Sequence, residues 1–156
     1  MQDQDLMLCK ALSIAGTATT ETVFTDQIYI PQIRNFKNVL VNDSPFNSGR
    51  MFWNCVVEDE DLLAGTDGSV ITFKLYNDTD ATPTTGGDVI VTFAITENTP
   101  SEHKDGTLLF SIPLPAGPLK PYFGASATIA TQTLSTGKVT SWIGTPHTQA
   151  TSRANS

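Results

Sequence analysis

The sequence VITFKLYNDTDATPTTGGDVIVTFAI, residues 70–95, contains two alternating apolar runs separated by a turn-rich segment. In the first run Ile71, Phe73 and Leu75 occupy every second position, so an extended chain places the three side chains on one face. The segment between the runs is rich in Asn, Asp, Gly and Pro, the residues that turns favour. The pattern predicts two β-strands joined as a hairpin.

The second run, residues 89–95, alternates in the same way as the first. Val89, Val91, Phe93 and Ile95 are predicted to face the core, with threonine among the residues on the opposite face. Threonine is abundant throughout the chain, and its branched Cβ favours strands over helix interiors. Composition therefore agrees with the local pattern.

Further strand-like stretches recur along the chain, with turn signals between them. They are residues 5–12, 22–30, 38–41, 50–57, 107–112, 122–130 and 138–143. Helical spacing of apolar residues is not sustained anywhere, and only residues 58–64 are compatible with one short helical turn. The sequence predicts an all-β protein: a two-sheet β-sandwich, jelly-roll-like, with eight or nine short antiparallel strands.

The 156 residues suit one domain, and we assign residues 1–143 to a single sandwich. Residues 144–156 lack large apolar side chains after Gly144 and are predicted to form a polar C-terminal arm. The start of the chain carries Asp3 and Asp5 where a signal peptide has positive charge, so we expect use without export. No apolar run is long enough to span a bilayer.

The charge balance argues against two classes of partner. The net charge is −7, and the nine Lys and Arg residues are scattered rather than clustered. Nucleic acids and anionic membrane surfaces both need clustered basic residues. We therefore expect neither as a partner.

The residues that most often carry catalysis are few. Cys9 and Cys55 lie outside any metal-binding spacing and are expected to be reduced and buried, although a single disulfide between them stays open. His103 and His147 are in polar segments and are expected to be solvated. We predict no enzymatic activity and no cofactor.

Two groups of carboxylates are candidate functional sites. The run from Glu58 to Asp61 could hold the paired carboxylates of a glycosidase, but four adjacent charges are more typical of a solvated loop. Asp78, Asp80 and Asp88 could supply oxygens to Ca²⁺, although their spacing fits plain turns better. No metal site is predicted beyond these weak candidates.

The two tryptophans have uncertain faces. Trp142 follows Lys138 and Thr140 at alternate positions, which places it on the polar face of its strand. An exposed tryptophan would anchor an interface, whereas a buried one would belong to the core. The same alternatives hold for Trp53.

The C-terminal third contains a proline-rich crossing between two strands, followed by a Gly-Lys step. Four prolines, Pro113, Pro115, Pro118 and Pro121, stiffen the crossing, and Lys120 and Tyr122 end it. This layout resembles the capsid cement, or decoration, proteins of tailed bacteriophages. In that family a PLP-G-KRYL crossing precedes a strand and a TAGKV turn opens the last one. Here the corresponding segments are LPAGPLKPYF, residues 114–123, and TGKVT, residues 136–140. The family's Lys-Arg-Tyr step is Lys-Pro-Tyr in this chain.

The resemblance implies a virion structural protein on the outer capsid surface. Such a protein is made in the host cytoplasm and bridges neighbouring major capsid subunits non-covalently, as a dimer or trimer. The candidate contact residues are Trp53, Leu119, Lys120, Tyr122, Lys138 and Trp142. The alternatives are a carbohydrate-binding jelly-roll module, which predicts exposed coplanar aromatics, and a head or tail accessory protein of a virion.

Overall fold

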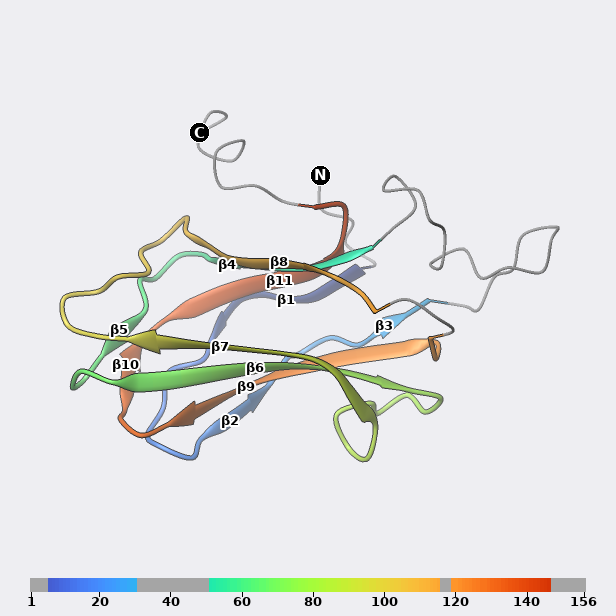
Figure 1. Cartoon of the computed structure of the whole chain (residues 1–156), viewed down its shortest axis with the longest axis horizontal. Helices are drawn as coiled ribbons and strands as arrows, with labels where there is room; N and C mark the ends of the chain where they lie inside the picture. The colour runs from blue at the N-terminus through green and yellow to red at the C-terminus, as the bar shows by residue number, and fades with distance from the viewer. Residues whose placement is uncertain (1–5, 31–50, 116–118, 147–156) are drawn as a thin grey trace, which may run out of the picture.

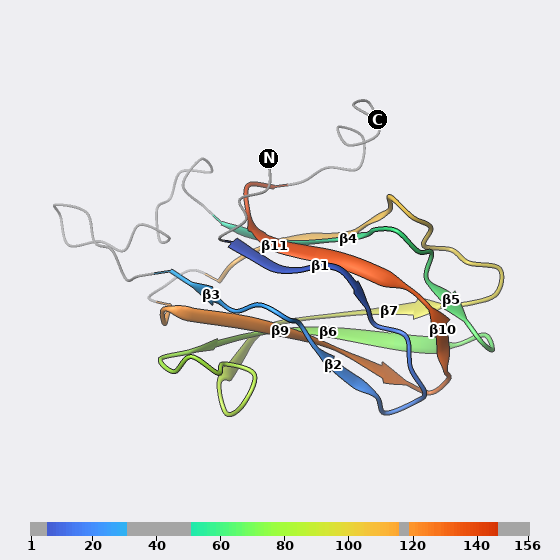
Figure 2. The same ribbon diagram turned by 180° about the vertical axis from the view of Figure 1, so that it is seen from behind.

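Two antiparallel sheets pack face to face in the computed structural model, which describes residues 6–30, 51–115 and 119–146 (Figures 1 and 2). The first sheet contains, in spatial order, β1 (Met7–Ser13), β11 (Lys138–Gly144), β4 (Phe52–Val57) and β8 (Leu108–Pro113). The second contains β2 (Glu21–Val23), β9 (Tyr122–Ala130), β6 (Ser69–Asp78) and β7 (Asp88–Glu97), and β3 (Ile28–Tyr29) also pairs with β9. A small sheet of β5 (Leu63–Ala64) and β10 (Leu134–Thr136) closes one end.

The strand order is that of a jelly roll. The first and last strands, β1 and β11, are neighbours, and the chain crosses repeatedly between the two layers so that β1, β4, β8 and β11 share one sheet and β2, β6, β7 and β9 the other. The predicted all-β sandwich is confirmed, and no helix occurs among the described residues. The described ranges contain eleven strands, more than the eight or nine predicted, and three of them, β3, β5 and β10, are too short for alternation to reveal.

The hairpin that residues 70–95 predicted is formed by β6 and β7. Ile71, Phe73 and Leu75 are fully buried, as the alternation required. Val89 was predicted to face the core and is instead 46% exposed. The reason is a register shift after Leu75, which moves the first residues of β7 out of phase with the core.

The core between the sheets is centred on four aromatic rings. Phe110 of β8 lies 4.5 Å from Trp53, 5.5 Å from Phe73 and 5.0 Å from Phe93, measured between ring centroids. Such tilted and edge-on contacts are the favourable geometries for aromatic pairs. The cluster joins β4 and β8 of one sheet to β6 and β7 of the other.

Other predicted strands differ from those in the structure or lie outside its described residues. Residues 22–30 form two short strands, β2 and β3, rather than one, and residues 38–41 lie outside the described residues. The short helical turn expected at residues 58–64 is wrong, because this segment is a bend followed by β5. Residues 147–156, most of the predicted C-terminal arm, and His147 also lie outside the described residues.

The two cysteines are buried free thiols in separate strands. Cys9 of β1 and Cys55 of β4 are both in register with Ser141 of β11, which lies between them. Two strand spacings separate their backbones by about 10 Å, beyond the roughly 7 Å limit for a disulfide. The disulfide left open by the sequence is therefore excluded by the register.

Burial of the thiols predicts alkaline destabilisation. Desolvation raises the pKa of Cys9 from 9.0 to about 12 and also raises the pKa of Cys55. Between pH 9 and 12 the unfolded thiols are ionised while the buried ones remain protonated, so the unfolded state binds fewer protons. The free energy of unfolding should fall as pH rises through this window, by up to about 1.4 kcal/mol per pH unit for each thiol.

Urea denaturation at a series of pH values, followed by circular dichroism, measures this slope. The double variant Cys9→Ala/Cys55→Ala should show a shallower decline, since lysine and tyrosine titration is common to both proteins. Equal slopes in the two proteins would contradict the assignment.

Candidate functional site

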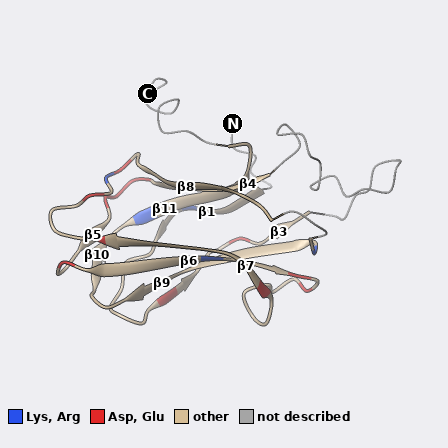
Figure 3. Cartoon of the chain, viewed as in Figure 1, with Lys and Arg blue, Asp and Glu red and all other residues tan. Residues whose placement is uncertain are grey.

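Two regions at opposite ends of the sandwich gather polar and charged side chains. One is the end of the proline-stiffened crossing between β8 and β9, and we call Tyr29, Asp88, Lys120 and Tyr122 the crossing corner. The other is an open pocket beside β5, which we call the acidic pocket. Figure 3 shows acidic residues in the loops at the β5 end.

The crossing corner is held in place by Asn77, a buried side chain at the end of β6. Its Nδ2 atom donates hydrogen bonds to the carbonyl oxygens of Lys120 at 2.7 Å and Tyr122 at 2.9 Å. Its Oδ1 atom accepts a hydrogen bond from the backbone N–H of Lys120 at 2.8 Å. One amide therefore fixes the backbone on both sides of Pro121.

The side chains of the crossing corner face solvent in pairs. Lys120 Nζ donates to Asp88 Oδ2 at 2.7 Å, and this hydrogen bond raises the pKa of the lysine. Tyr29 is 56% exposed, and its ring packs against the ring of the half-buried Tyr122, with 4.8 Å between the ring centroids and a tilt of 37° between the planes. The crossing corner thus presents a pair of tyrosine rings together with the ammonium group of Lys120, which the Asp88 carboxylate orients.

Leu119, the other residue of the crossing predicted to contact a partner, is 8% exposed and packs in the core. The prediction that Leu119 is a surface contact residue is therefore wrong. Leu114 at the start of the crossing is buried in the same way, so two leucines anchor the crossing. Pro113 is the last residue of the edge strand β8, where a missing N–H is tolerated.

The candidate calcium ligands do not converge. Asp88 is engaged by Lys120, and Asp78 Oδ1 accepts from the backbone N–H of Thr79 at 2.6 Å. Asp80 is exposed in the following loop. Across residues 6–30, 51–115 and 119–146, no three His, Cys, Asp or Glu side chains are grouped so as to hold a metal ion.

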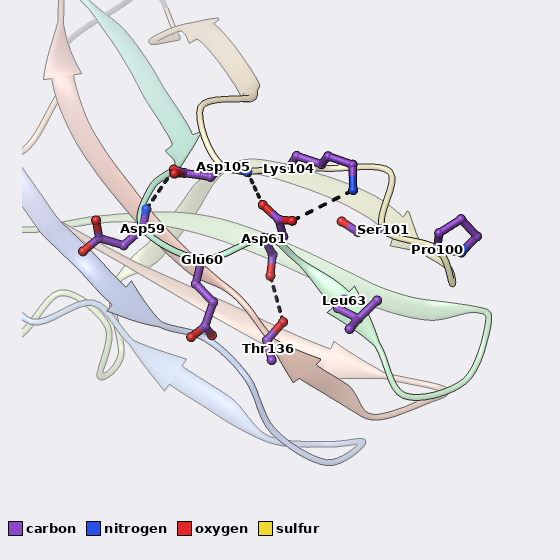
Figure 4. A pocket seen from close by; sticks show the side chains of 9 residues that line it. All are labelled: Asp59, Glu60, Asp61, Leu63, Pro100, Ser101, Lys104, Asp105 and Thr136. Carbon is purple, nitrogen blue, oxygen red and sulfur yellow. Dashed lines mark hydrogen bonds and ion pairs between the residues drawn. The ribbon is translucent and has the colours of Figure 1, made fainter.

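The acidic pocket is an open depression of about 580 Å³ (Figure 4). It lies between the acidic run, the loop after β7 and the end of β10. Its lining residues are Asp59, Glu60, Asp61, Leu63, Pro100, Ser101, Lys104, Asp105 and Thr136.

The acidic run at the edge of this pocket works mainly as a set of acceptors for neighbouring backbone. Glu60 Oε1 accepts from the N–H of Gly137 at 2.9 Å, and Asp61 Oδ1 from the N–H of Asp105 at 2.6 Å. Glu58 Oε2 accepts a short hydrogen bond from Thr140 Oγ1. The carboxylates are thus spread over separate contacts, whereas a glycosidase needs two that face one substrate.

Gly137, the glycine of the Gly-Lys step, is required by this packing. Its φ of 153° is unfavourable for other residues, and a Cβ at this position would lie 2.4 Å from Leu62 Cδ2, so a side chain here would force the buried Leu62 to move. The close approach brings its N–H onto Glu60. Lys138, a predicted contact residue, follows it as a half-buried residue whose carbonyl oxygen accepts from the N–H of Glu58 at 3.0 Å.

A buried carboxylate supports the wall of the acidic pocket, and its role was not predicted from the sequence. Glu97 at the end of β7 is 0% exposed, and its Oε2 atom lies 2.5 Å from His103 Nδ1. Its Oε1 atom accepts from the backbone N–H groups of Glu102 at 2.7 Å and Asn98 at 3.3 Å. The expectation that His103 is solvated is wrong, because its side chain is only 24% exposed.

The pair of Glu97 and His103 resembles the orienting half of a catalytic triad, which also needs a nucleophile on the histidine. The nearby Ser101 Oγ donates instead to the carbonyl oxygens of Leu62 and His103. In this arrangement the contact between Glu97 and His103 and the hydroxyl of Ser101 both fix the loop between β7 and β8.

Neither tryptophan is a surface residue. Trp53 is 0% exposed, and its Nε1 donates to Ser141 Oγ at 2.8 Å within the core. Its candidacy as a contact residue is therefore wrong.

Trp142 points away from the core, as alternation indicated, yet is only 3% exposed. Its cross-strand neighbours Met7 and Asn54 are buried with it, and Asn54 Nδ2 donates to the carbonyl oxygen of Thr145 at 3.1 Å. The chain after β11 therefore bends back beside this face, and the prediction of an exposed anchor is wrong.

No family model matches the chain, and no curated protein matches it. Among the described residues, nothing forms a helix with the length and apolar character needed to cross a membrane.

Proposed function

We propose that this protein is a virion structural protein that decorates the outside of an icosahedral phage capsid. It would cement neighbouring major capsid subunits by non-covalent bridging, as a homo-oligomer on the outer surface of the particle. Many weak contacts repeated over a closed shell add up to strong retention, so no single deep binding site is needed.

The observation that carries the proposal is the crossing corner. The segment that resembles decoration proteins, residues 112–143, contains the end of the edge strand β8, the crossing, the central strand β9, the short strand β10 and nearly all of the central strand β11. At the end of that crossing Lys120 and Tyr122 are presented beside Tyr29 on a backbone that Asn77 fixes. Tyrosine is among the residues enriched at the anchor positions of protein interfaces, and a charged side chain beside it can add electrostatic complementarity to a partner.

Capsid binding tests the role of this corner. Lys120→Glu should reduce affinity for capsids stripped of the protein at least about tenfold, because a close charge pair across an interface would become a repulsive one. Tyr29→Ala should also weaken binding without unfolding the chain, since its ring is 56% exposed. Co-sedimentation with purified mature capsids measures both.

The matched control is Lys104→Glu, which places the same charge change at the acidic pocket. It should leave binding unchanged. Equal loss for Lys104→Glu and Lys120→Glu would show a general charge effect rather than a contact at the corner. Cryo-EM of the parent particle tests the whole proposal, and a capsid shell without density for this chain would contradict it.

A carbohydrate-binding module remains the second candidate on one observation only. The tryptophans expected to form its platform are buried, which leaves the tilted pair of Tyr29 and Tyr122 as an aromatic surface for a sugar ring. A glycan array separates the two functions: a hit lost in Tyr29→Ala would favour the module. Copy number per particle separates a cement protein from a head or tail accessory protein.

A further inference from the structure

β7 is an edge strand of the second sheet. Within the described residues it pairs with β6 alone, over the whole length of both strands. Every second residue of an antiparallel edge strand points its N–H and C=O away from the sheet. Unless a partner pairs with them, these groups form a template for another strand.

The edge lacks the features that usually protect such a template. Its charges lie only at its two ends, Asp88 and Glu97, and residues 89–96 are uncharged and free of proline. Both end charges are already engaged, Asp88 by Lys120 and Glu97 by His103. Figure 3 shows the strand uncoloured by charge between its ends. The bulge near Val89 leaves a regular edge from Val91 to Glu97.

We propose that β7 pairs antiparallel with β7 of a second copy of this chain, about a two-fold axis at Ala94. This register places Thr92 opposite Thr96, Phe93 opposite Ile95, and Ala94 opposite its own copy. Thr–Thr and aromatic–β-branched pairs are among the favourable cross-strand contacts. The register also keeps the core-facing side chains of both copies on the same side of the joined sheet.

The core-facing side chains of β7 gain cover from this pairing. Phe93 and Ile95 are only half-buried in the single chain, although both pack against the core. Phe93 contacts Phe110 of β8, and β8 is the edge strand of the other sheet on the same side of the sandwich (Figure 1). A second copy at β7 would cover the ring at this open side.

The chemistry of the edge selects a copy of itself over a charged partner. The chain carries a net charge of −7, so two copies approach most easily where neither presents a charge. Thr92, Ala94 and Thr96 are exposed, uncharged and self-complementary about the axis. The inference deepens the homo-oligomer of the proposed function, but its test needs no capsid and can fail independently.

Sedimentation velocity of the purified full chain, over a range of concentrations, is the first measurement. The wild type should reach the mass of a dimer. Ala94→Lys and Ala94→Glu should each weaken dimerisation at least about tenfold, because like charges would face each other on the axis. Ala81→Lys and Ala81→Glu, at an exposed alanine in the loop after β6, are the matched controls and should dimerise as the wild type does.

Mixing the two variants gives the decisive result. Ala94→Lys and Ala94→Glu should restore the dimer when combined in equal amounts, since opposite charges then meet across the axis. Restoration also shows that both variants are folded. A monomeric wild type, a dimer that survives both Ala94 substitutions, or failure of the mixture to dimerise would each overturn the proposal.

Discussion

Replacing Glu97 with alanine is expected to lower the free energy of unfolding by about 3 kcal/mol, because two backbone N–H groups and the His103 ring would lose a buried hydrogen-bond partner. The Glu97 side chain is 0% exposed and accepts from two backbone N–H groups as well as contacting His103. Without it, these donors would remain in a site with no acceptor to replace the carboxylate. Urea denaturation at neutral pH, followed by circular dichroism, measures the loss.

Two further variants define the origin of this effect. Glu97→Gln keeps an oxygen for the two backbone N–H groups and should lose only about 1–2 kcal/mol. Glu102→Ala, at the neighbouring exposed carboxylate, should change stability by no more than about 0.5 kcal/mol. If Glu97→Ala and Glu102→Ala were equally mild, Glu97 would not anchor the loop.

The consequence of losing Glu97 extends to the acidic pocket. His103 accepts the backbone N–H of Leu62 through its carbonyl oxygen at 2.9 Å, so the loop after β7 holds the segment that leads into β5. Hydrogen exchange at Leu62 should therefore accelerate in Glu97→Ala more than exchange in β6. The loop after β7 forms part of the pocket wall, and Asp59 and Asp61 of the acidic run hydrogen-bond to Asp105 in this loop.

The sandwich could be predicted from the sequence because burial in a sheet follows a period of two. In β6 the alternation assigned Ile71, Phe73 and Leu75 correctly. The prediction that Val89 faces the core was wrong, because a β-bulge changes the phase of a strand without changing its composition. β5 and β10 are too short for any periodic signal, and their pairing is fixed by the packing of the loops.

Alternation assigns a face and not an exposure, and this explains the error at Trp142. The residue does lie on the side opposite the core, but the chain after Gly144 bends back beside it. For Trp53, on the core face, alternation also could not predict the hydrogen-bond partner. Its indole N–H is satisfied by Ser141, a residue 88 positions away that only the folded register brings near.

The two buried polar residues, Asn77 and Glu97, have a recognisable signal in the sequence. Asn77 continues the inward series of Ile71, Phe73 and Leu75, and Glu97 continues the inward series that ends at Ile95. A polar residue at an inward position must find partners, because burying it unpaired costs free energy. The identity of those partners could not be predicted: Lys120 is 43 residues from Asn77 along the chain.

Asn77→Ala should lower the free energy of unfolding by about 3 kcal/mol, because three hydrogen bonds are lost and the backbone groups of Lys120 and Tyr122 are left unsatisfied. Asn77→Asp tests the same geometry more sharply. A carboxylate can still accept from the N–H of Lys120, but it would face two carbonyl oxygens without a donor to offer them. Thermal and urea denaturation should rank the variants with Asp80→Ala, an exposed control, close to the wild type.

The same substitution links the stability of the fold to the proposed function. Because Asn77 fixes the backbone on both sides of Pro121, its loss should loosen the crossing corner before the sandwich unfolds. Capsid affinity should then fall in Asn77→Ala under conditions where circular dichroism still shows a folded protein, while Asp80→Ala binds normally. If Asn77→Ala were folded and bound as tightly as the wild type, a rigid crossing corner would not be what the capsid recognises.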